Sequence, residues 1–205
     1  LDLLETNHQN VMDQDLKLRA SDNCMRLLHT LEKNYDNAYQ GVASQSKIFP
    51  NAATFNHALY TLAHSAKGAM CGQEAYFILD RMFQRCRQYR DSAATSKIAA
   101  PPEPSIITYN SVIHAIAKSG ASNAGFLAED VFDKMEVWKK ECDDRDEGGT
   151  RLYHGVYPNS RTLASLLDAW ANAENVNGSS LVRERTTSIL EAALDNRRSY
   201  VRRVK

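Results

Sequence analysis

The sequence predicts an all-α protein built from stacked antiparallel pairs of helices. Apolar residues recur at steps of three and four through most of the chain, which is the period of a helix with one buried face. The pattern also repeats, because Pro50, Pro104 and Pro158 each precede an amphipathic segment at a constant spacing of 54 residues (50, 104, 158). A single pair of helices cannot bury its apolar stripe alone, so the repeated pairs are expected to stack and to share a core.

On this register the chain divides into four predicted units, which are residues 1–51, 52–105, 106–159 and 160–205. The first is incomplete and is expected to hold the end of one helix, a polar turn, a second helix that begins near Ser21, and a link. The last is divergent, and its second helix is expected to begin near Ser179 or Ser180 and to end in the basic segment 197–205. Basic side chains at a helix end complement the helix dipole, and they also offer contacts to phosphates.

Each unit places apolar residues at matching positions of its two helices. In residues 106–159, Ser119 and Gly120 end the first helix. The expected core positions of this unit are Tyr109, Val112, Ile113, Ile116 and Ala117 in the first helix, and Ala128, Val131, Phe132 and Met135 in the second. The matching second-helix sets elsewhere are Ala75, Ile78, Leu79 and Met82; Thr186, Ile189, Leu190 and Ala193; and Cys24, Leu27, Leu28 and Leu31.

Composition limits the kinds of partner. Lys plus Arg and Asp plus Glu both number 25, so the formal net charge is zero and no global basic field attracts nucleic acid. Any such binding must be local. No apolar run approaches the roughly 18 residues that span a bilayer, so no membrane partner is predicted. The four cysteines lie far apart without a C-x-x-C pair, which favours reduced thiols and a reducing compartment.

The sequence contains none of the residue patterns that usually mark an enzyme. The six histidines never stand four residues apart, and no H-E-x-x-H motif occurs. There is no glycine-rich phosphate loop and no nucleophile elbow. We therefore expect a binding module rather than an enzyme, with no metal, no cofactor and no small-molecule substrate.

The segments that open the two complete units resemble the pentatricopeptide-repeat (PPR) family. They read Thr54-Phe55-Asn56 and Thr108-Tyr109-Asn110 after a Pro-polar step, and residues 128–135 fit the family's second-helix pattern A-x-x-[LVF]-[FL]-[DE]-x-M. The likeness is closest in residues 106–159 and weakest in the last unit, where Leu163-Ala164 replaces the aromatic-Asn pair. The resemblance implies a right-handed solenoid. The 54-residue period is longer than is usual for the family, which implies long second helices and long links.

The resemblance also implies a function, which is sequence-selective binding of single-stranded RNA in a mitochondrion or plastid for transcript processing, stability or translation. It places the RNA-binding residues as Asn56 with Ser105 and clamp Ala53, Asn110 with Asn159 and clamp Ile107, and Ala164 with clamp Arg161. An Asn amide offers a donor and an acceptor together, so it can address the Watson–Crick edge of a pyrimidine. The first pair is expected to favour cytosine, the second a pyrimidine, and Ala164 neither.

Two alternatives stay open at this stage. Asn51, Ser105 and Asn159 directly precede helices and are favoured N-caps, so capping alone accounts for their positions. Asn56 and Asn110 are harder to explain structurally, because Asn is a mediocre helix former. The rival function is a protein-interaction or ribosome-associated helical-repeat scaffold without base readout. The neutral charge favours it, whereas the absence of the W-x-x-L-G-x-x-Y pattern of tetratricopeptide repeats speaks against it.

Overall fold

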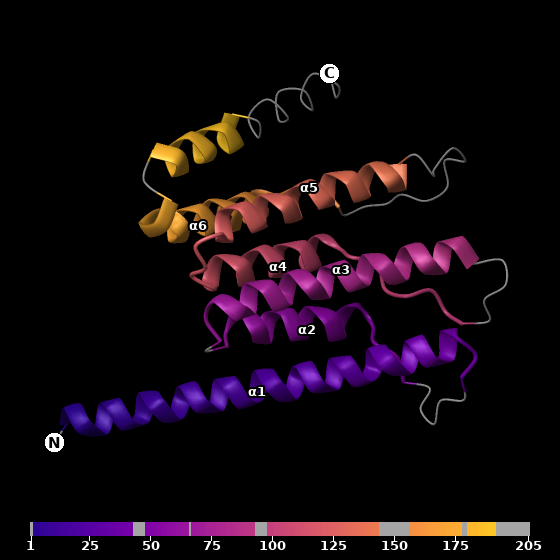
Figure 1. The fold of residues 1–205 in the computed structure, drawn as a ribbon, viewed down its shortest axis with the longest axis horizontal. Helices are drawn as coiled ribbons and strands as arrows, with labels where there is room; N and C mark the ends of the chain where they lie inside the picture. The colour runs from indigo at the N-terminus through magenta and orange to yellow at the C-terminus, as the bar shows by residue number, and fades with distance from the viewer. Residues whose placement is uncertain are drawn as a thin grey trace.

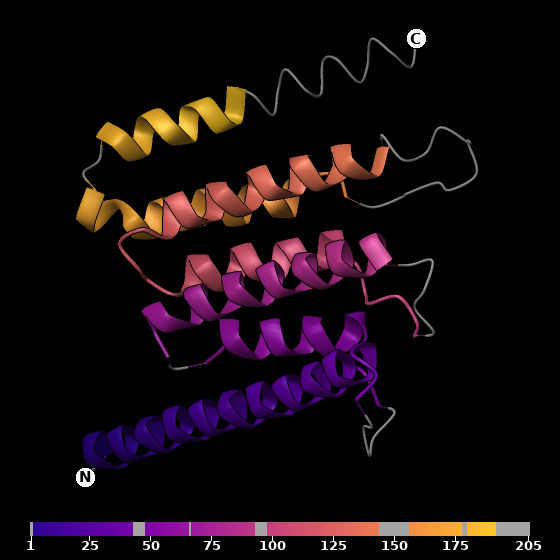
Figure 2. The same cartoon turned by 45° about the vertical axis from the view of Figure 1, so that its right-hand side comes forward.

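The computed structural model describes residues 2–42, 48–65, 67–92, 98–143, 156–177 and 180–191. Within these ranges the regular structure is entirely helical: α1 (Asp2–Tyr39), α2 (Ala52–Ala63), α3 (Ala69–Ser92), α4 (Ile106–Lys118), α5 (Ala124–Asp143) and α6 (Ser160–Asn177), followed by helical residues 180–191. The helices lie side by side in one stack, with α1 at one end and residues 180–191 at the other (Figures 1 and 2). The predicted all-α class is confirmed. None of these described helices is long and apolar enough to cross a membrane.

The first helix is longer than the sequence led us to expect. α1 runs unbroken for 38 residues, so the predicted turn and the second helix starting near Ser21 are absent. The segment contains neither Gly nor Pro, the two residues that most readily end a helix. Ser21 is fully buried on the inner face of α1 instead of capping a new helix. The N-terminal unit is therefore one long helix and a link, not the end of one helix followed by another.

The helices α2, α4 and α6 begin in the same way, with a side-chain cap and a threonine three residues later. The cap accepts a hydrogen bond from the backbone N–H of the threonine, and the threonine Oγ1 accepts one from the backbone N–H of the cap. The first of these bonds joins Asn51 and Thr54 (2.9 Å), Ser105 and Thr108 (3.4 Å), and Asn159 and Thr162 (3.0 Å). The predicted capping role of the three residues that precede these helices is confirmed.

The apolar faces of neighbouring helices meet in one continuous core. α4 lies at its centre, in contact with α2, α3, α5 and α6. All five predicted core positions of α4 are buried, as are those of α3, and one cluster extends from Leu28 in α1 to Ala169 in α6. In α5 the residues Ala128, Val131 and Met135 are buried and Phe132 is half-buried. The sharing of a core between successive units, expected from the repeat, is thus observed.

At the two ends of the stack the predicted core is partly wrong. Leu27 is 59% exposed and Leu190 is 46% exposed, because each lies on a helix that is covered from one side only. Val182 is buried in the last helix instead. α6 runs to Asn177, and the next helical residues begin at Ser180, where the second helix of the last unit was expected to start. Ala193 and the basic segment 197–205 lie outside the described residues.

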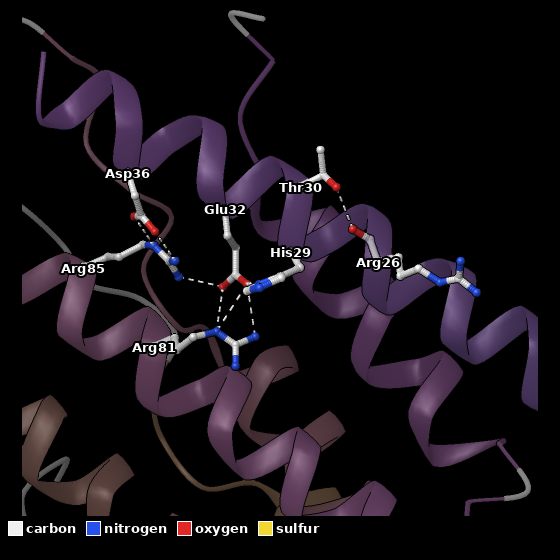
Figure 3. A network of polar contacts seen from close by, with 7 residues as sticks. All are labelled: Arg26, His29, Thr30, Glu32, Asp36, Arg81 and Arg85. Atoms are coloured by element: carbon white, nitrogen blue, oxygen red, sulfur yellow. Dashed lines mark hydrogen bonds and ion pairs between the residues drawn. The ribbon is translucent and has the colours of Figure 1, made fainter. Parts of the chain in front are cut away.

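A buried ion cluster joins α1 to α3 (Figure 3). The Glu32 carboxylate is 1% exposed and accepts hydrogen bonds from Arg81 Nε at 3.1 Å and from Arg85 Nη1 at 2.6 Å. Arg85 also holds Asp36 with two bonds of 2.8 Å, from Nε and Nη2. Such forked pairing satisfies most of the guanidinium donors at once. Polar side chains thus bridge α1 and α3, while the backbone of α1 packs against α2.

A close contact between α5 and α6 yields a stability prediction. A Cβ added at buried Gly125 would lie 2.4 Å from Cδ2 of Trp170, whose fully buried indole donates through Nε1 to Glu129 Oε1 at 3.0 Å. Because the indole cannot move without losing this packing, we expect Gly125→Ala to lower the free energy of unfolding by about 1–3 kcal/mol. Urea denaturation measures this loss when Gly125→Ala is made in the parent protein and again in a protein that already carries Trp170→Phe. If the contact is the cause, the cost shrinks in the second background; an equal cost in both contradicts it.

Candidate nucleic-acid interface

The predicted RNA-binding residues lie on the row formed by the first helices of the units. α2 contacts α4 and α4 contacts α6, and the three helices run in the same direction, so equivalent positions recur from helix to helix (Figure 1). Matching side chains at their N-terminal turns therefore meet across each interface. This arrangement brings together residues that are about 50 positions apart in the chain, such as Asn56 and Thr108, whose separation is 52.

A threonine–asparagine bond recurs at both interfaces of this row. Thr108 Oγ1 donates to Asn56 Oδ1 at 3.0 Å, and Thr162 Oγ1 donates to Asn110 Oδ1 at 2.6 Å. Each threonine also accepts the backbone N–H of its cap, so its hydroxyl is used as donor and as acceptor. The series stops at Ala164, which has no acceptor to offer to a following unit. The recurrence of Thr and Asn in the sequence therefore has a structural cause that the sequence did not reveal.

Asn110 is more deeply embedded than expected. It is 7% exposed, and besides accepting from Thr162 its Nδ2 donates to Asn159 Oδ1 at 3.4 Å. These hydrogen bonds give Asn110 a structural role at the interface of α4 and α6, while its role in binding stays a prediction. A carboxamide carries two N–H groups and two lone pairs on oxygen, so one donor and one acceptor of Asn110 are left for a ligand. Asn56 is half-buried and accepts one bond from Thr108, so more of its donors and acceptors are left for a ligand.

The predicted partners of the two asparagines lie close to them. Asn159 is in direct contact with Asn110, and Ser105 Oγ lies 3.3 Å from Thr108 Oγ1, which in turn binds Asn56. The structure thus brings together both predicted pairs, the first through a threonine. Asn159 Oδ1 also accepts the backbone N–H of Arg161 at 3.0 Å, so it is saturated by protein donors.

The row of first helices is hollowed between α2 and α6. A cavity of about 360 Å³ is lined by Asn56, His57, Tyr60, Ile107, Asn110, Ser111 and Arg161. Four of the predicted RNA-binding residues are in this set: Asn56, Ile107, Asn110 and Arg161. Ile107 is 60% exposed and Tyr60 is 61% exposed, so apolar surface faces solvent there. The lining includes a guanidinium and an imidazole but no carboxylate, a composition that suits an anionic ligand with flat apolar parts.

The other four predicted residues do not line the hollow. Ala53 and Ala164 are exposed on α2 and α6 and offer only a methyl group, while Ser105 and Asn159 act as caps. The structure therefore brings Asn56, Asn110, Ile107 and Arg161 together around the hollow. Ala53 and Ala164 are exposed and outside its lining.

Sequence reasoning missed the aromatic residues of this face. The Tyr60 ring lies 4.1 Å from the ring of His64, measured between centroids, and His64 lies 6.1 Å from His114 of α4. A sequence signal was present, because Asn56, Tyr60 and His64 follow each other at steps of four, as do Asn110, His114 and Lys118. The spacing alone did not indicate that the two rows lie side by side on neighbouring helices.

The imidazole of His114 on this face has a lowered pKa. Burial lowers the pKa of its imidazole, and the neighbouring positive charge of Lys118, together with His64 and Arg161, lowers it further. Asp168 acts in the opposite direction. His114 is therefore neutral at neutral pH. Among the described residues, no group of three or more His, Cys, Asp or Glu side chains is arranged to hold a metal ion.

We compared the chain with protein-family models, with curated proteins and with solved structures. No family model matches it, and no match is found among the curated proteins or among the solved structures. Inference about its function therefore starts from the side chains of the hollow.

Proposed function

We propose that this chain is a PPR-like module, a right-handed solenoid of stacked helix pairs that binds single-stranded RNA along α2, α4 and α6. The observation that carries the proposal is the hollow in which Asn56, Asn110, Ile107 and Arg161 converge. Repeat proteins of this architecture bind extended ligands along the face formed by equivalent helices. The proposed biological role, taken from the sequence resemblance, is processing, stability or translation of transcripts in a mitochondrion or plastid.

The chemistry of the hollow supports a nucleobase as the group that enters it. The free donor and acceptor of each Asn amide match the paired donors and acceptors on the edge of an unpaired base. Ile107 offers an apolar surface between the two asparagines along the row, against which a base can pack. Arg161 provides a fixed positive charge for the phosphate that accompanies each base. A leaning towards pyrimidines follows from the resemblance.

The charge of the chain limits how tight this binding can be. With zero net charge, only a few cations, those near the hollow and those of the basic segment 197–205, are expected to neutralise phosphates. The salt dependence should therefore be shallow, with a slope near −0.7 per phosphate contacted on a single strand. We expect modest affinity and selectivity that is confined to two neighbouring bases.

A protein-interaction scaffold is the second candidate, and one observation on α1 favours it. Met12, Leu16 and Leu27 recur at helical spacing and are 56%, 60% and 59% exposed. Apolar side chains at such spacing on one helix are typical of surfaces that another helix covers. The two functions make opposite predictions about the discrimination between RNA sequences.

The test compares pyrimidine and purine oligonucleotides of about ten residues at one salt concentration. We expect the parent to prefer the pyrimidine strand about tenfold or more, because single-strand contacts are worth on the order of 1–3 kcal/mol per base. Asn110→Ala should reduce this preference at one position. Fluorescence anisotropy titrations give the affinities. Equal affinities for the two strands in the parent protein would contradict base reading and favour the scaffold.

A matched variant separates the structural role of Asn110 from its role in binding. Thr162→Val breaks the same hydrogen bond from the far side and leaves the Asn110 amide in place, and it also removes the acceptor for the backbone N–H of Asn159. Both variants are expected to lower the free energy of unfolding by about 1–2 kcal/mol, since each leaves a buried polar group without its partner. Only Asn110→Ala should change the base preference. If Thr162→Val changes it equally, Asn110 acts on RNA through the fold alone.

A further inference from the structure

We propose that Tyr60, His64 and His114 form a stacking strip that holds one further unpaired base of the bound strand without selecting its identity. This inference rests on the proposed function and extends its site along α2 and α4. The strip begins at the wall of the hollow, which Tyr60 lines, and continues past the residues proposed to read bases.

The geometry of Tyr60 leaves part of its ring for a ligand. One side of the ring is covered by the His64 imidazole, with centroids 4.1 Å apart and planes tilted by 30°. Tyr60 also lines the hollow, and its side chain is 61% exposed. A base that enters the hollow can therefore stack on Tyr60 and extend the column of rings. Every nucleobase has a π-face, so such a contact is tolerant of sequence.

The strip is held in place before a ligand arrives. His64 Nδ1 lies 2.8 Å from the backbone oxygen of Tyr60, and a carbonyl oxygen can only accept, so Nδ1 carries the proton of this bond. The bond fixes the imidazole against the Tyr60 ring. His114 lies 6.1 Å from His64 and joins the strip to α4. Rings that are already ordered lose little conformational entropy when a base stacks on them.

The charges around the strip match a phosphate backbone. Lys118 of α4, His64 at the C-terminal end of α2 and Arg161 of α6 lower the pKa of His114, and Asp168 of α6 raises it. Burial and the nearby charge of Lys118 keep His114 neutral at neutral pH in the free protein. A phosphate placed beside Lys118 and Arg161 would favour the imidazolium, so strand binding should be accompanied by proton uptake. Affinity is then expected to rise as the pH falls from about 7.5 to about 5.5, through the range in which imidazole groups titrate.

The experiment uses four variants of the full chain and the two decamers described above. Tyr60→Ala is expected to weaken the binding of pyrimidine and purine strands by the same factor, about tenfold, because the stacking contact does not depend on base identity. Tyr60→Phe should bind like the parent, since the ring is kept. Phe77→Ala is the matched control, because Phe77 of α3 is 51% exposed and does not line the hollow. His114→Gln should reduce the dependence of affinity on pH.

The outcomes separate the strip from the proposed function. If neither decamer binds the parent protein, both proposals are wrong. If the decamers bind and Tyr60→Ala binds them as tightly as the parent, the strip is wrong and RNA binding stands. A loss confined to one of the two strands in Tyr60→Ala would make Tyr60 a reader of base identity and overturn the non-selective role. Circular dichroism of Tyr60→Ala checks its fold. If that variant unfolds, Tyr60→Leu, which keeps an apolar side chain without a ring, should show the same equal loss on both strands, and parent-like binding by it would overturn the strip.

Discussion

Replacing Ile113 with alanine is expected to lower the free energy of unfolding of the helical stack by about 2–5 kcal/mol. Ile113 is completely buried in α4, and α4 contacts four other helices. The cavity left by the lost methyl groups would therefore weaken several interfaces at once. Because the stability of a repeat stack is a sum over neighbours, the change should loosen α2 and α6 as well as α4. Urea denaturation gives the size of the effect, and hydrogen exchange gives its spread.

The same helix offers a matched control. Ile107 is 60% exposed on α4 and lines the hollow, so Ile107→Ala removes the same atoms from a position that contributes little to the core. We expect its free energy of unfolding to change by less than about 0.5 kcal/mol, as for most surface substitutions. Its RNA affinity, in contrast, should fall. Equal loss of stability in the two variants would show that the helix register described for α4 is wrong.

A third substitution, Phe132→Ala, tests whether the loss of stability follows the burial of the side chain. Phe132 and Ile113 are both expected core positions, but the structure leaves Phe132 half-buried in α5. Phe132→Ala is therefore expected to lower the free energy of unfolding by less than the roughly 3–5 kcal/mol that is usual for a fully buried phenylalanine. Thermal unfolding of the two variants under identical conditions gives their order.

The helices of the repeated units could be predicted because their signals are local. An apolar period of 3.6, a Ser or Asn cap and a glycine after the last turn are read within a few residues of each other. α4 shows all three, with Ser105 as its cap and Gly120 in the left-handed region at φ 63°. α1 was misread for the same reason. Ser21 has a strong capping preference, and the local pattern could not show that it would be buried against the stack.

The proposed binding face was predictable only in part, because its key contacts join residues that are far apart in sequence. The bond between Thr162 and Asn110 spans 52 positions, and no local rule connects them. Once the repeat register is known, the threonine and the asparagine are seen to recur together. The distance between them still requires the stacked helices. The burial of Asn110 follows from the same contact and gives it a place in the interface besides its predicted role in binding.

The ion cluster between α1 and α3 supplies the second large expected effect. Glu32→Ala should lower the free energy of unfolding by about 3 kcal/mol, the low end of the range for breaking a buried ion pair. The carboxylate is 1% exposed and serves both Arg81 and Arg85, so its removal leaves two guanidinium groups short of an acceptor (Figure 3). The effect stays at the low end because Arg81 is 33% exposed and Asp36 still pairs with Arg85. Chemical denaturation measures the loss.

An exposed ion pair on the same helix serves as the control for Glu32. Arg19 and Asp15 of α1 lie 2.8 Å apart, and their side chains are 73% and 51% exposed. Asp15→Ala should therefore cost no more than about 0.5 kcal/mol, and about 1 M salt should remove most of that cost. The cost of Glu32→Ala should persist in the same salt, because a buried pair is poorly screened. If both variants lose the same stability, the cluster does not hold α1 to α3.

Hydrogen exchange locates the consequence of Glu32→Ala within the stack. Among the described helices the backbone of α1 packs only against α2, and the ion pairs that Glu32 and Asp36 make with Arg81 and Arg85 link α1 to α3. Exchange in the second half of α1 should therefore speed up in Glu32→Ala, while α4 and α6 keep the protection of the parent. RNA affinity should be unchanged, because no residue of the cluster lines the hollow. Faster exchange in α6 would show that α1 supports the whole stack, and a lower affinity would show that it supports the binding face.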